Sequence, residues 1–490
     1  MIADAREMSI ASPVLLTNWE RFDVSQPLVN LAAYLRSWGT SEGLAGVIAT
    51  WWSSTVDTAE PHPMNQSPTI QALVRLHEKG IGGDWNWLDW AQVEGDALLQ
   101  QIDNSGMLRN GWGDIPGRSR SPVIGFAAAG ALYALAGACQ KEHYLASADH
   151  IMKGYEALWE SGDALSHGVN NQAARWAMSR LQRYLLLGEE HDLNKAVQIG
   201  YGILSEIISD GTRRGAIYQG SNSDILISVY VGKCLYPLLS LYQVSGDSVF
   251  LDAAKLIASY MNKARTGQDG LFISAAEPQG VFYKATQKLA TIDRRFFKGS
   301  LKLHKLRRKM IRYWRTSEYP IFIARAADSI RGLAALNTFD ETTKPLTNDL
   351  IRILLSFQQA HGGFPNTIGY SGSCEVSVWQ DVVAPTRWNS YVFQLLVDLA
   401  ISSQDLDLPS PKVTWPVFHT VGSARDQKLV ETEDKLSLLR ADIKPTNINW
   451  EINKKMGKTF AEPAWRGELT GERTYRRMMI EKQLENKANV

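Results

Sequence analysis

The strongest constraint on the fold is a helical hairpin pattern that returns four times along the sequence. Each copy is an apolar helical stretch, a short polar turn and a second helical stretch. The copies begin at Gly125, Ala173, Lys233 and Ala324. Aligned on the leucine after the turn, at positions 145, 193, 251 and 346, successive copies are 48, 58 and 95 residues apart. Repeats of about 20–50 residues are typical of arrays whose units bury their apolar faces only against one another. We therefore expect a closed ring or a solenoid of helix pairs.

The rest of the chain also alternates between predicted helices and loops. Helical periodicity is predicted from about Leu28, through the run 43–52, and again at 70–79 and 87–102, with the proline-containing stretch 60–68 ending a helix. Loops rich in glycine, asparagine and aromatic residues alternate with the helix pairs, at 161–172, 210–224, 268–280 and 361–381. In a ring, several of these loops would gather at one end, and we expect the functional site there.

Composition predicts one large globular domain with appendages. The 490 residues are 44% hydrophobic and 21% charged, as in ordinary soluble proteins. Because a helical repeat can extend as one unit, we expect a ring domain over residues 1–410, with a basic insertion at 280–319. The periodic pattern fades after residue 400, so 411–490 is predicted to be a charged C-terminal extension.

The three cysteines indicate neither a disulfide framework nor a zinc cluster. Cys139, Cys234 and Cys374 are far apart and show no paired spacing, which fits a reducing compartment. The N-terminal residues lack the charged and apolar regions of a secretory signal, and the sequence predicts no membrane-spanning stretch. We expect a cytoplasmic protein, or a membrane-associated one. A pI near 7.7 argues against nucleic acid as a partner.

One segment departs strongly from the overall charge balance. Residues 294–315 contain ten Lys or Arg and no acidic residue, so the remaining chain has 42 basic and 51 acidic residues. If the segment is helical, Leu301, Leu303, Leu306, Met310 and Trp314 approximate an apolar stripe. A basic amphipathic helix can bind an anionic membrane or an acidic protein, or it can pack on the ring with its charges solvated. The residues proposed for such contact are Arg307, Arg308, Lys309, Arg312 and Trp314.

The repeats, with loops such as HGGFPN at 361–366, resemble those of the α/α toroids. The resemblance covers roughly residues 30–400 and is architectural. It implies an all-α fold, an (α/α) toroid or barrel of repeated helical hairpins. Several glycoside hydrolases, polysaccharide lyases and sugar epimerases use this ring, as do terpenoid cyclases and protein prenyltransferases. Because one fold hosts many activities, the function has to be argued from the site.

The terpenoid alternative lacks its chemical motifs in this sequence. Cyclases that ionise a prenyl diphosphate need an aspartate-rich metal motif, and those that protonate an alkene share a DxDD element; the chain has neither. A zinc prenyltransferase needs an Asp, Cys and His set, to which only Cys374 with His361 and Asp381 could contribute. A terpenoid cyclase-like enzyme therefore remains a secondary alternative.

Carbohydrate chemistry fits the side chains better. The sequence has 16 tryptophans and 17 tyrosines, many of them in the predicted loops. Flat aromatic rings can pack against the apolar faces of sugars, although they also pack helices together. We expect Trp112, Trp379 and Trp388 to contribute to substrate binding.

The first candidate constellation is SHGVNNQAAR, at the start of the second repeat. Asn171 and Arg175 are one helical turn apart and can share a face. In uronate lyases and uronyl epimerases of this architecture, Asn, Arg and His neutralise the substrate carboxylate, which acidifies the adjacent C5 proton. The resemblance thus implies His167 as acid or base, Asn171 and Arg175 as carboxylate partners and Tyr370 as a second proton carrier. The alternative is an ordinary asparagine helix cap beside a surface histidine.

The second candidate constellation is CEVSVWQDVVAPTRWNSY. A glycosidase needs two carboxylates about 5–10 Å apart. Glu375 and Asp381 lie in one predicted loop and could approach that separation, with Arg387 and Trp388 as substrate-binding neighbours. Carboxylates in loops are also commonly just solvated.

These patterns predict a carbohydrate-active enzyme. We expect it to act on a glycan or a polysaccharide precursor by a lyase, epimerase or glycoside hydrolase reaction that needs no cofactor and no metal. The alternative outside enzymology is a noncatalytic scaffold of a membrane-associated polysaccharide assembly system, recruited through the basic segment. If the loops share one end of the ring, the two constellations should converge there.

Overall fold

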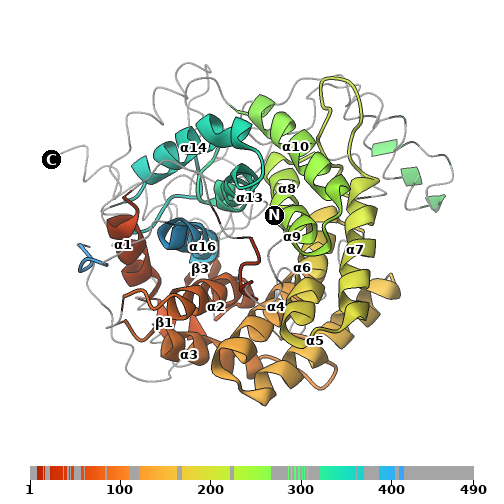
Figure 1. Cartoon of the computed structure of the whole chain (residues 1–490). Coiled ribbons are helices and arrows are strands. Elements are labelled where there is room, and N and C mark those ends of the chain that lie inside the picture. Colours follow the sequence, from red (N-terminus) through yellow and green to blue (C-terminus); the bar gives the residue numbers. More distant parts are fainter. Residues whose placement is uncertain are drawn as a thin grey trace, which may run out of the picture.

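The computed structural model shows a closed ring of helices (Figure 1). The described residues are 8–14, 16, 23–36, 38–40, 43–44, 46–48, 57–59, 61–82, 85–109, 121–162, 168–220, 226–265, 321–359, 361–368, 386–402 and 408–412, with scattered positions between 285 and 306. The predicted (α/α) toroid is therefore confirmed. The tail from residue 413 lies outside the described residues, so the predicted division at residues 410 and 411 stays a prediction.

Two concentric layers of helices form the ring. The inner layer is α2 (Pro63–Glu78), α4 (Pro122–Cys139), α6 (Asn170–Leu187), the broken pair α8 (Ser228–Gly232) and α9 (Leu235–Ser245), α13 (Ala327–Asn337) and α16 (Thr386–Ser402). Each inner helix contacts the next, and α16 returns to α2. The outer layer is α1 (Ser25–Arg36), α3 (Trp87–Leu99), α5 (Glu142–Glu160), α7 (Glu190–Leu204), α10 (Ser248–Lys263) and α14 (Lys344–Ser356). All four hairpins expected from the repeats are present.

The repeated turns explain why the hairpins look alike in sequence. The inner helix ends at a left-handed residue, with φ of 53° at Gln140, 73° at Gly188 and 73° at Gly246. In each case the backbone N–H of that residue donates to a carbonyl four residues earlier, which is a common way to end a helix. The outer helix begins two residues later, so the chain reverses in a very short turn.

Inner helices approach one another closely where the sequence supplies glycine. A Cβ on Gly232 would lie 2.0 Å from the Ser329 hydroxyl, and one on Gly332 would lie 2.4 Å from the Leu235 Cβ. Because α8 and α9 pack against α13 at these positions, side chains from the two parts of the chain are brought together in the ring.

Two local predictions are wrong for the described residues. The run 43–52 was expected to be helical, but Gly43–Leu44 and Gly46–Ile48 are the strands β2 and β3. They pair with β1 (Gly39–Thr40) and β4 (Asp57–Ala59), and the β-branched residues of β3 favour that state. Residues 63–68 do not end a helix but begin α2. Pro63 is tolerated in the first helical turn and the His62 ring caps that turn, while Pro68 lies inside the helix.

Helix α4 is long and apolar enough to cross a membrane, contrary to the expectation that no stretch would be. In the ring it is an inner helix, and most of its residues are buried against neighbouring helices. A helix that is apolar on all sides is expected in such a position. Its composition therefore reflects its place in the core.

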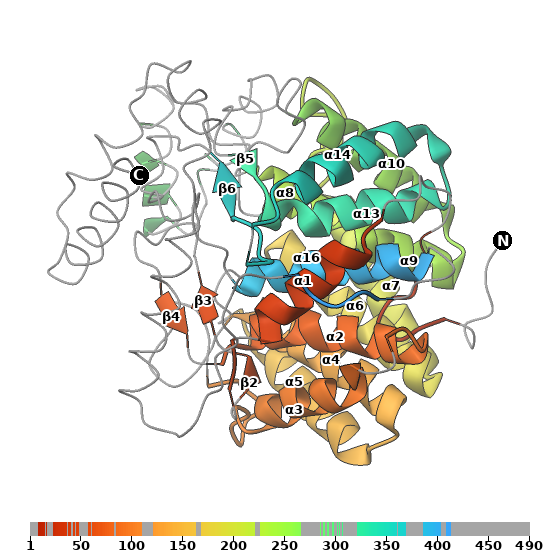
Figure 2. The same cartoon turned by 90° about the vertical axis from the view of Figure 1, so that its left-hand side faces the viewer.

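The two ends of the ring differ (Figure 2). One end carries the N-termini of the inner helices together with β3, β4 and the pair β5 (Ile321–Phe322) and β6 (Thr367–Ile368). We call it the N-terminal end of the inner helices. At the other end, the segment Ser9–Val14 passes through the middle of the ring. The Ile10 carbonyl accepts a hydrogen bond from Gln182, and the Val14 N–H donates to the Tyr236 hydroxyl. We call the segment Ser9–Val14 the plug, because it fills the middle of the ring at that end.

Candidate active site

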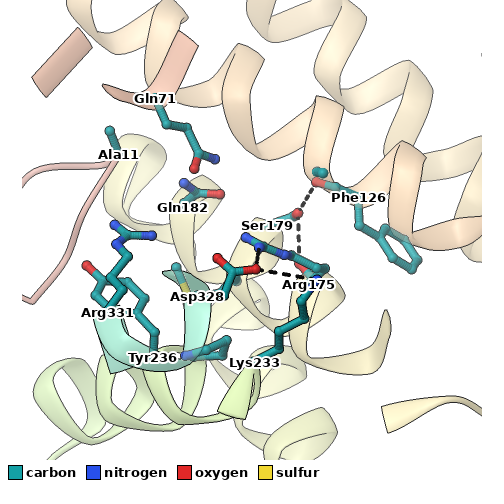
Figure 3. Close-up of a pocket in the computed structure, with 13 residues that line it drawn as sticks. Ala11, Gln71, Phe126, Arg175, Ser179, Gln182, Lys233, Tyr236, Asp328 and Arg331 are labelled. Carbon is teal, nitrogen blue, oxygen red and sulfur yellow. Dashed lines mark hydrogen bonds and ion pairs between the residues drawn. The ribbon is translucent and has the colours of Figure 1, made fainter. Parts of the chain in front are cut away.

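Three charged residues and a tyrosine, from four inner elements, meet inside the ring, near the N-terminal end of the inner helices. Arg175 comes from α6, Lys233 follows α8, Asp328 belongs to α13 and Tyr391 to α16. Arg175, Lys233 and Asp328 line a narrow pocket with about 20 Å³ of free space, together with Tyr236 and Arg331, and point toward one another in Figure 3. A pocket with converging polar groups is the usual form of a small-molecule site.

Asp328 joins the two cations of this group. Nη2 of Arg175 donates to Oδ2 of Asp328 at 3.0 Å, and Nζ of Lys233 lies 3.5 Å from the same oxygen (Figure 3). The side chains of Lys233 and Asp328 are each 8% exposed. Ion pairs this well buried need further partners to offset the loss of hydration.

Aromatic rings provide part of that support. The Trp388 ring centre lies 4.6 Å from Lys233 Nζ, 4.6 Å from the Arg325 guanidinium and 4.3 Å from the Arg387 guanidinium. The Tyr391 ring lies 5.1 Å from the Arg175 guanidinium and 5.2 Å from Lys233 Nζ. Cations are attracted to the faces of such rings. We call Arg175, Lys233, Arg325, Arg387 and Asp328 the cationic cluster.

The cluster makes Lys233 titrate near neutral pH. Burial lowers the pKa of Lys233 to about 7, with Arg387, Arg175 and Arg325 adding to the effect and Asp328 opposing it. Burial also lowers the pKa of Arg387 to about 9 and of Arg325 to about 10. A lysine whose pKa lies near neutrality can both accept and donate a proton.

Tyr391 places a hydroxyl in the same surroundings. The side chain is 2% exposed, and among the described residues its Oη has no hydrogen-bond partner. Burial raises the pKa of Tyr391, and Arg175 partly counteracts this. Buried hydroxyls normally have partners, so one that lacks them is available to a ligand or a water molecule.

A second polar network lies deeper in the ring, next to the plug. Nε of Arg331 donates to Oδ2 of Asp398 at 2.6 Å, and its Nη2 donates to Ser12 at 3.1 Å. The Ser12 and Tyr236 hydroxyls share a hydrogen bond of 2.5 Å. Arg75 lies 3.9 Å from Asp398 and 3.4 Å from Glu78. We call these residues the plug network.

Several residues expected from the sequence lie in or beside the cationic cluster. Arg175 belongs to the first constellation, and Arg387 and Trp388 belong to the second; Lys233 is a neighbour of all three. Asn171 is half-buried in the first turn of α6, and its Oδ1 has no hydrogen-bond partner among the described residues. The proposed cap is absent, because α6 begins after Val169 and the neighbouring Asn170 donates to the Tyr218 carbonyl.

The other predicted site residues lie outside the described residues. They are His167, Tyr370, Glu375, Asp381, Trp112 and Trp379 in the predicted loops, and Arg307, Arg308, Lys309, Arg312 and Trp314 in the basic segment. Their roles stay predictions.

Sequence reasoning missed Lys233, Asp328, Arg325 and Tyr391. For three of them, Lys233, Arg325 and Asp328, the sequence does contain a feature that could have identified them. Lys233 is the one charged residue in the apolar run 225–246, and Arg325 and Asp328 are three positions apart in the inner part of a repeat. Charges on a face that must be buried are costly, so they indicate either a structural ion pair or a site. Tyr391 had no such signal.

One group among the described residues has metal-ligand geometry. Glu189, His191 and Asp192 could bring one ligand atom each to a common point at the start of α7. Arg183 and Arg180 already contact Asp192, and Arg183 also contacts Glu189 at 2.5 Å. These arginines neutralise the carboxylates, so the group is better explained as an ion-pair network between α6 and α7.

Comparisons with known proteins rest on structure. No protein-family model matches the sequence. No curated protein matches it either. A sugar epimerase from a ruminal bacterium has a TM-score of 0.57 at 11% identity, over 79% of this chain and 99% of that chain. A D-mannose isomerase has a TM-score of 0.53 at 11% identity, over 76% of this chain and 96% of that chain. A family 76 glycoside hydrolase from a bovine Bacteroides thetaiotaomicron strain has a TM-score of 0.50 at 10% identity, over 80% of this chain and 78% of that chain.

These neighbours are carbohydrate-active enzymes built as α/α toroids, and at such low identity the likeness is one of architecture. The chain therefore has the α/α-toroid fold that sugar epimerases, sugar isomerases and glycoside hydrolases share.

Proposed function

We propose that this chain is a carbohydrate-active enzyme that moves a proton on an acidic sugar, in an epimerase or lyase reaction. The observation that carries the proposal is Lys233, a buried lysine with a pKa of about 7. It lines the ring pocket with Arg175 and Asp328, and its Nζ lies 5.2 Å from the centre of the Tyr391 ring. The sugar epimerase and the D-mannose isomerase among the fold neighbours support a sugar substrate.

The cluster favours an anionic sugar. The described part of the cluster contains four basic side chains and one carboxylate, and the three guanidiniums already disfavour the charged form of Lys233. A substrate carboxylate brought beside Arg175 would relieve that repulsion. Charge-assisted hydrogen bonds from guanidinium to carboxylate are among the strongest in proteins.

The reaction uses the acidity of the carbon next to that carboxylate. Neutral Lys233 accepts the C5 proton, and the C5–H electron pair moves into the carboxylate group, whose developing charge Arg175 stabilises. In an epimerase, a proton then returns to C5 on the opposite face, with Tyr391, His167 or Tyr370 as donor. In a lyase, the electron pair instead forms a C4–C5 double bond and expels the O4 substituent, which leaves with a proton.

This chemistry is favoured over glycoside hydrolysis for a specific reason. A hydrolase needs two carboxylates at the site. Among the described residues Asp328 is the carboxylate of the cluster, and it is engaged by Arg175 and Lys233. Glu375 and Asp381 remain the residues on which a hydrolase would depend.

The test is isotope exchange. The protein is incubated in deuterated water with glucuronate- and mannuronate-containing oligosaccharides. We expect deuterium at C5, or the ultraviolet absorbance of a C4–C5 double bond, with a rate that rises through about pH 7 as Lys233 loses its proton. Cleavage of neutral mannooligosaccharides without exchange on any uronate would contradict the proposal and support hydrolysis.

The variant Lys233→Arg sharpens this test, because it keeps a positive charge but cannot act as a base near neutral pH. We expect exchange to fall by about 10²–10⁴-fold, with the loss in kcat and not in KM. The matched control is Lys255→Arg on α10, a half-exposed lysine that also pairs with an aspartate, Asp340, at 3.4 Å. The control should keep full activity. A loss confined to KM would assign Lys233 to binding.

A further inference from the structure

Large apolar side chains are exposed in one short part of the chain, outside the ring pocket. The described residues include ten large hydrophobics with substantial exposure, and six of them fall between positions 289 and 306. They are Leu289 (53% exposed), Ile292 (45%), Phe296 (68%), Phe297 (52%), Leu301 (58%) and Leu306 (55%). Single exposed apolar residues are ordinary, but a concentration of them marks an interaction surface.

The same part of the chain is strongly basic. Residues 294–315 carry ten Lys or Arg and no acidic residue. The acidic residue just before this stretch, Asp293, is 1% exposed. Its carboxylate accepts hydrogen bonds from the backbone N–H groups of Leu301 and Leu303, at 3.1 and 3.2 Å. Asp293 is thus buried against the backbone of Leu301 and Leu303 and is not an exposed acidic group.

We propose that residues 289–315, which include the basic segment 294–315, dock the protein on an anionic lipid surface. Exposed phenylalanine and leucine side chains can enter the boundary between headgroups and acyl chains, while lysine and arginine side chains neutralise anionic headgroups. The ten basic residues by themselves would fit an acidic protein, and the exposed side chains of Phe296 and Phe297 add an apolar component that a lipid surface accepts. The combination of both features therefore favours lipid.

The position of the basic segment gives the docked protein an orientation. Its described positions lie outside the ring at the end that carries β5 and β6 (Figure 2). That end also holds the N-termini of the inner helices and the cationic cluster. Docking would turn this end of the ring toward the membrane.

Sedimentation of the full chain with lipid vesicles tests the proposal. We expect binding to phosphatidylcholine vesicles that contain phosphatidylglycerol, little binding to pure phosphatidylcholine, and loss of binding as salt rises, because screening acts over about 8–10 Å near physiological ionic strength. Replacing Arg307, Arg308, Lys309 and Arg312 by glutamine should weaken binding by about fivefold for each charge near the surface. This readout needs no substrate, so it is independent of the proposed sugar chemistry.

The double variant Phe296→Ser/Phe297→Ser separates lipid insertion from simple charge attraction. We expect at least about a tenfold loss of vesicle binding with an unchanged Tm, because side chains already exposed contribute little to folding. The matched control is Val93→Ser/Val249→Ser, which removes two hydrophobics that are 50% and 45% exposed elsewhere. It should bind vesicles as the wild type does.

Three results would overturn the proposal. The first is failure of the wild type to bind anionic vesicles. The second is undiminished binding by the phenylalanine variant, which would reduce the interaction to charge alone. The third is binding of a soluble polyglutamate peptide in preference to vesicles, which would identify an acidic protein as the partner.

Discussion

The two buried charge networks inside the ring have opposite character. In the plug network, Arg331 and Arg75 face Asp398 and Glu78, and the hydroxyls of Ser12 and Tyr236 add hydrogen bonds. Within the described part of the chain, Asp398 Oδ1 and Arg75 Nε have ion-pair contact but no hydrogen bond. Although burial opposes it, Asp398 and Tyr236 raise the pKa of Arg331. In the cationic cluster, cations gather around Trp388, and burial lowers the pKa values of Lys233, Arg325 and Arg387. In the same cluster, although burial opposes it, Tyr391 and Asp328 raise the pKa of Arg175.

The difference in charge balance between the two networks suggests different roles for them. A buried network whose charges match is expected to stabilise a single arrangement of its helices. A buried network that disfavours its own charged lysine costs stability, and such groups cluster at functional sites. We propose on this basis that the plug network closes the ring and that the cationic cluster is the site of the proposed chemistry.

The largest expected effect comes from deleting one cation in each network. Arg331→Met leaves Asp398 buried with Arg75 at 3.9 Å and the Ser12 hydroxyl at 3.3 Å, so the free energy of unfolding should fall by about 3–5 kcal/mol. Lys233→Met leaves Asp328 bonded to Arg175 and removes a lysine that burial disfavours. We expect it to leave stability at neutral pH unchanged or higher while abolishing activity. Denaturant unfolding of both variants checks this, and equal losses would erase the distinction.

The pH dependence of stability should also single out Lys233. In the unfolded chain this lysine keeps its proton up to about pH 10.5, whereas in the fold it loses the proton near pH 7. Between these values the unfolded state binds more protons, so stability rises with pH, by at most about 1.4 kcal/mol per unit. Unfolding measured at pH 7 and pH 9 in wild type and Lys233→Met reports the contribution as the difference between the two slopes. Parallel slopes would show that Lys233 is protonated throughout.

The two buried tyrosines form a matched pair. Tyr236→Phe removes the hydroxyl that bonds Ser12 at 2.5 Å, and we expect a loss of about 1 kcal/mol. Tyr391→Phe removes a hydroxyl without a partner among the described residues, so stability should be unchanged or slightly higher. If thermal unfolding ranks the two variants in the reverse order, the Tyr391 hydroxyl has a structural partner.

The smallest effect is stabilisation by a simple acidic sugar. Glucuronate at a concentration equal to its Kd should add about 0.4 kcal/mol, measured as a small rise in Tm. Neutral glucose at the same concentration should have no such effect. Arg175→Gln should abolish the glucuronate shift because it removes the proposed carboxylate partner. A shift that persists in this variant would place the anion elsewhere.

Much of the fold could be predicted because its signals are local. The hairpin rhythm sets helix, turn and helix within about 35 residues, and the left-handed positions at Gly188 and Gly246 mark the reversals. The two wrong predictions also concerned short stretches of sequence. The glycines and β-branched residues of 43–48 form short strands, and Pro63 begins a helix because its missing N–H is harmless in the first turn.

The candidate site could be predicted only in part. Arg175, Arg387 and Trp388 were identified because they flank distinctive loops, yet their shared neighbour Lys233 was not. Its importance depends on residues from α6, α13 and α16 that are as many as 212 positions apart along the chain, between Arg175 and Arg387.

The sequence by itself determined the helix pairs, the ring class and the basic segment, because periodicity, turn residues and charge runs are properties of neighbouring residues. Only the tertiary structure decided which buried charges would lie beside a charge of opposite sign. Closing the ring sets Asp398 against Arg331 at one depth and crowds Lys233 among guanidiniums at another. The cost of burying a charge depends on the distances to all its neighbours, and those distances exist only once the ring has closed.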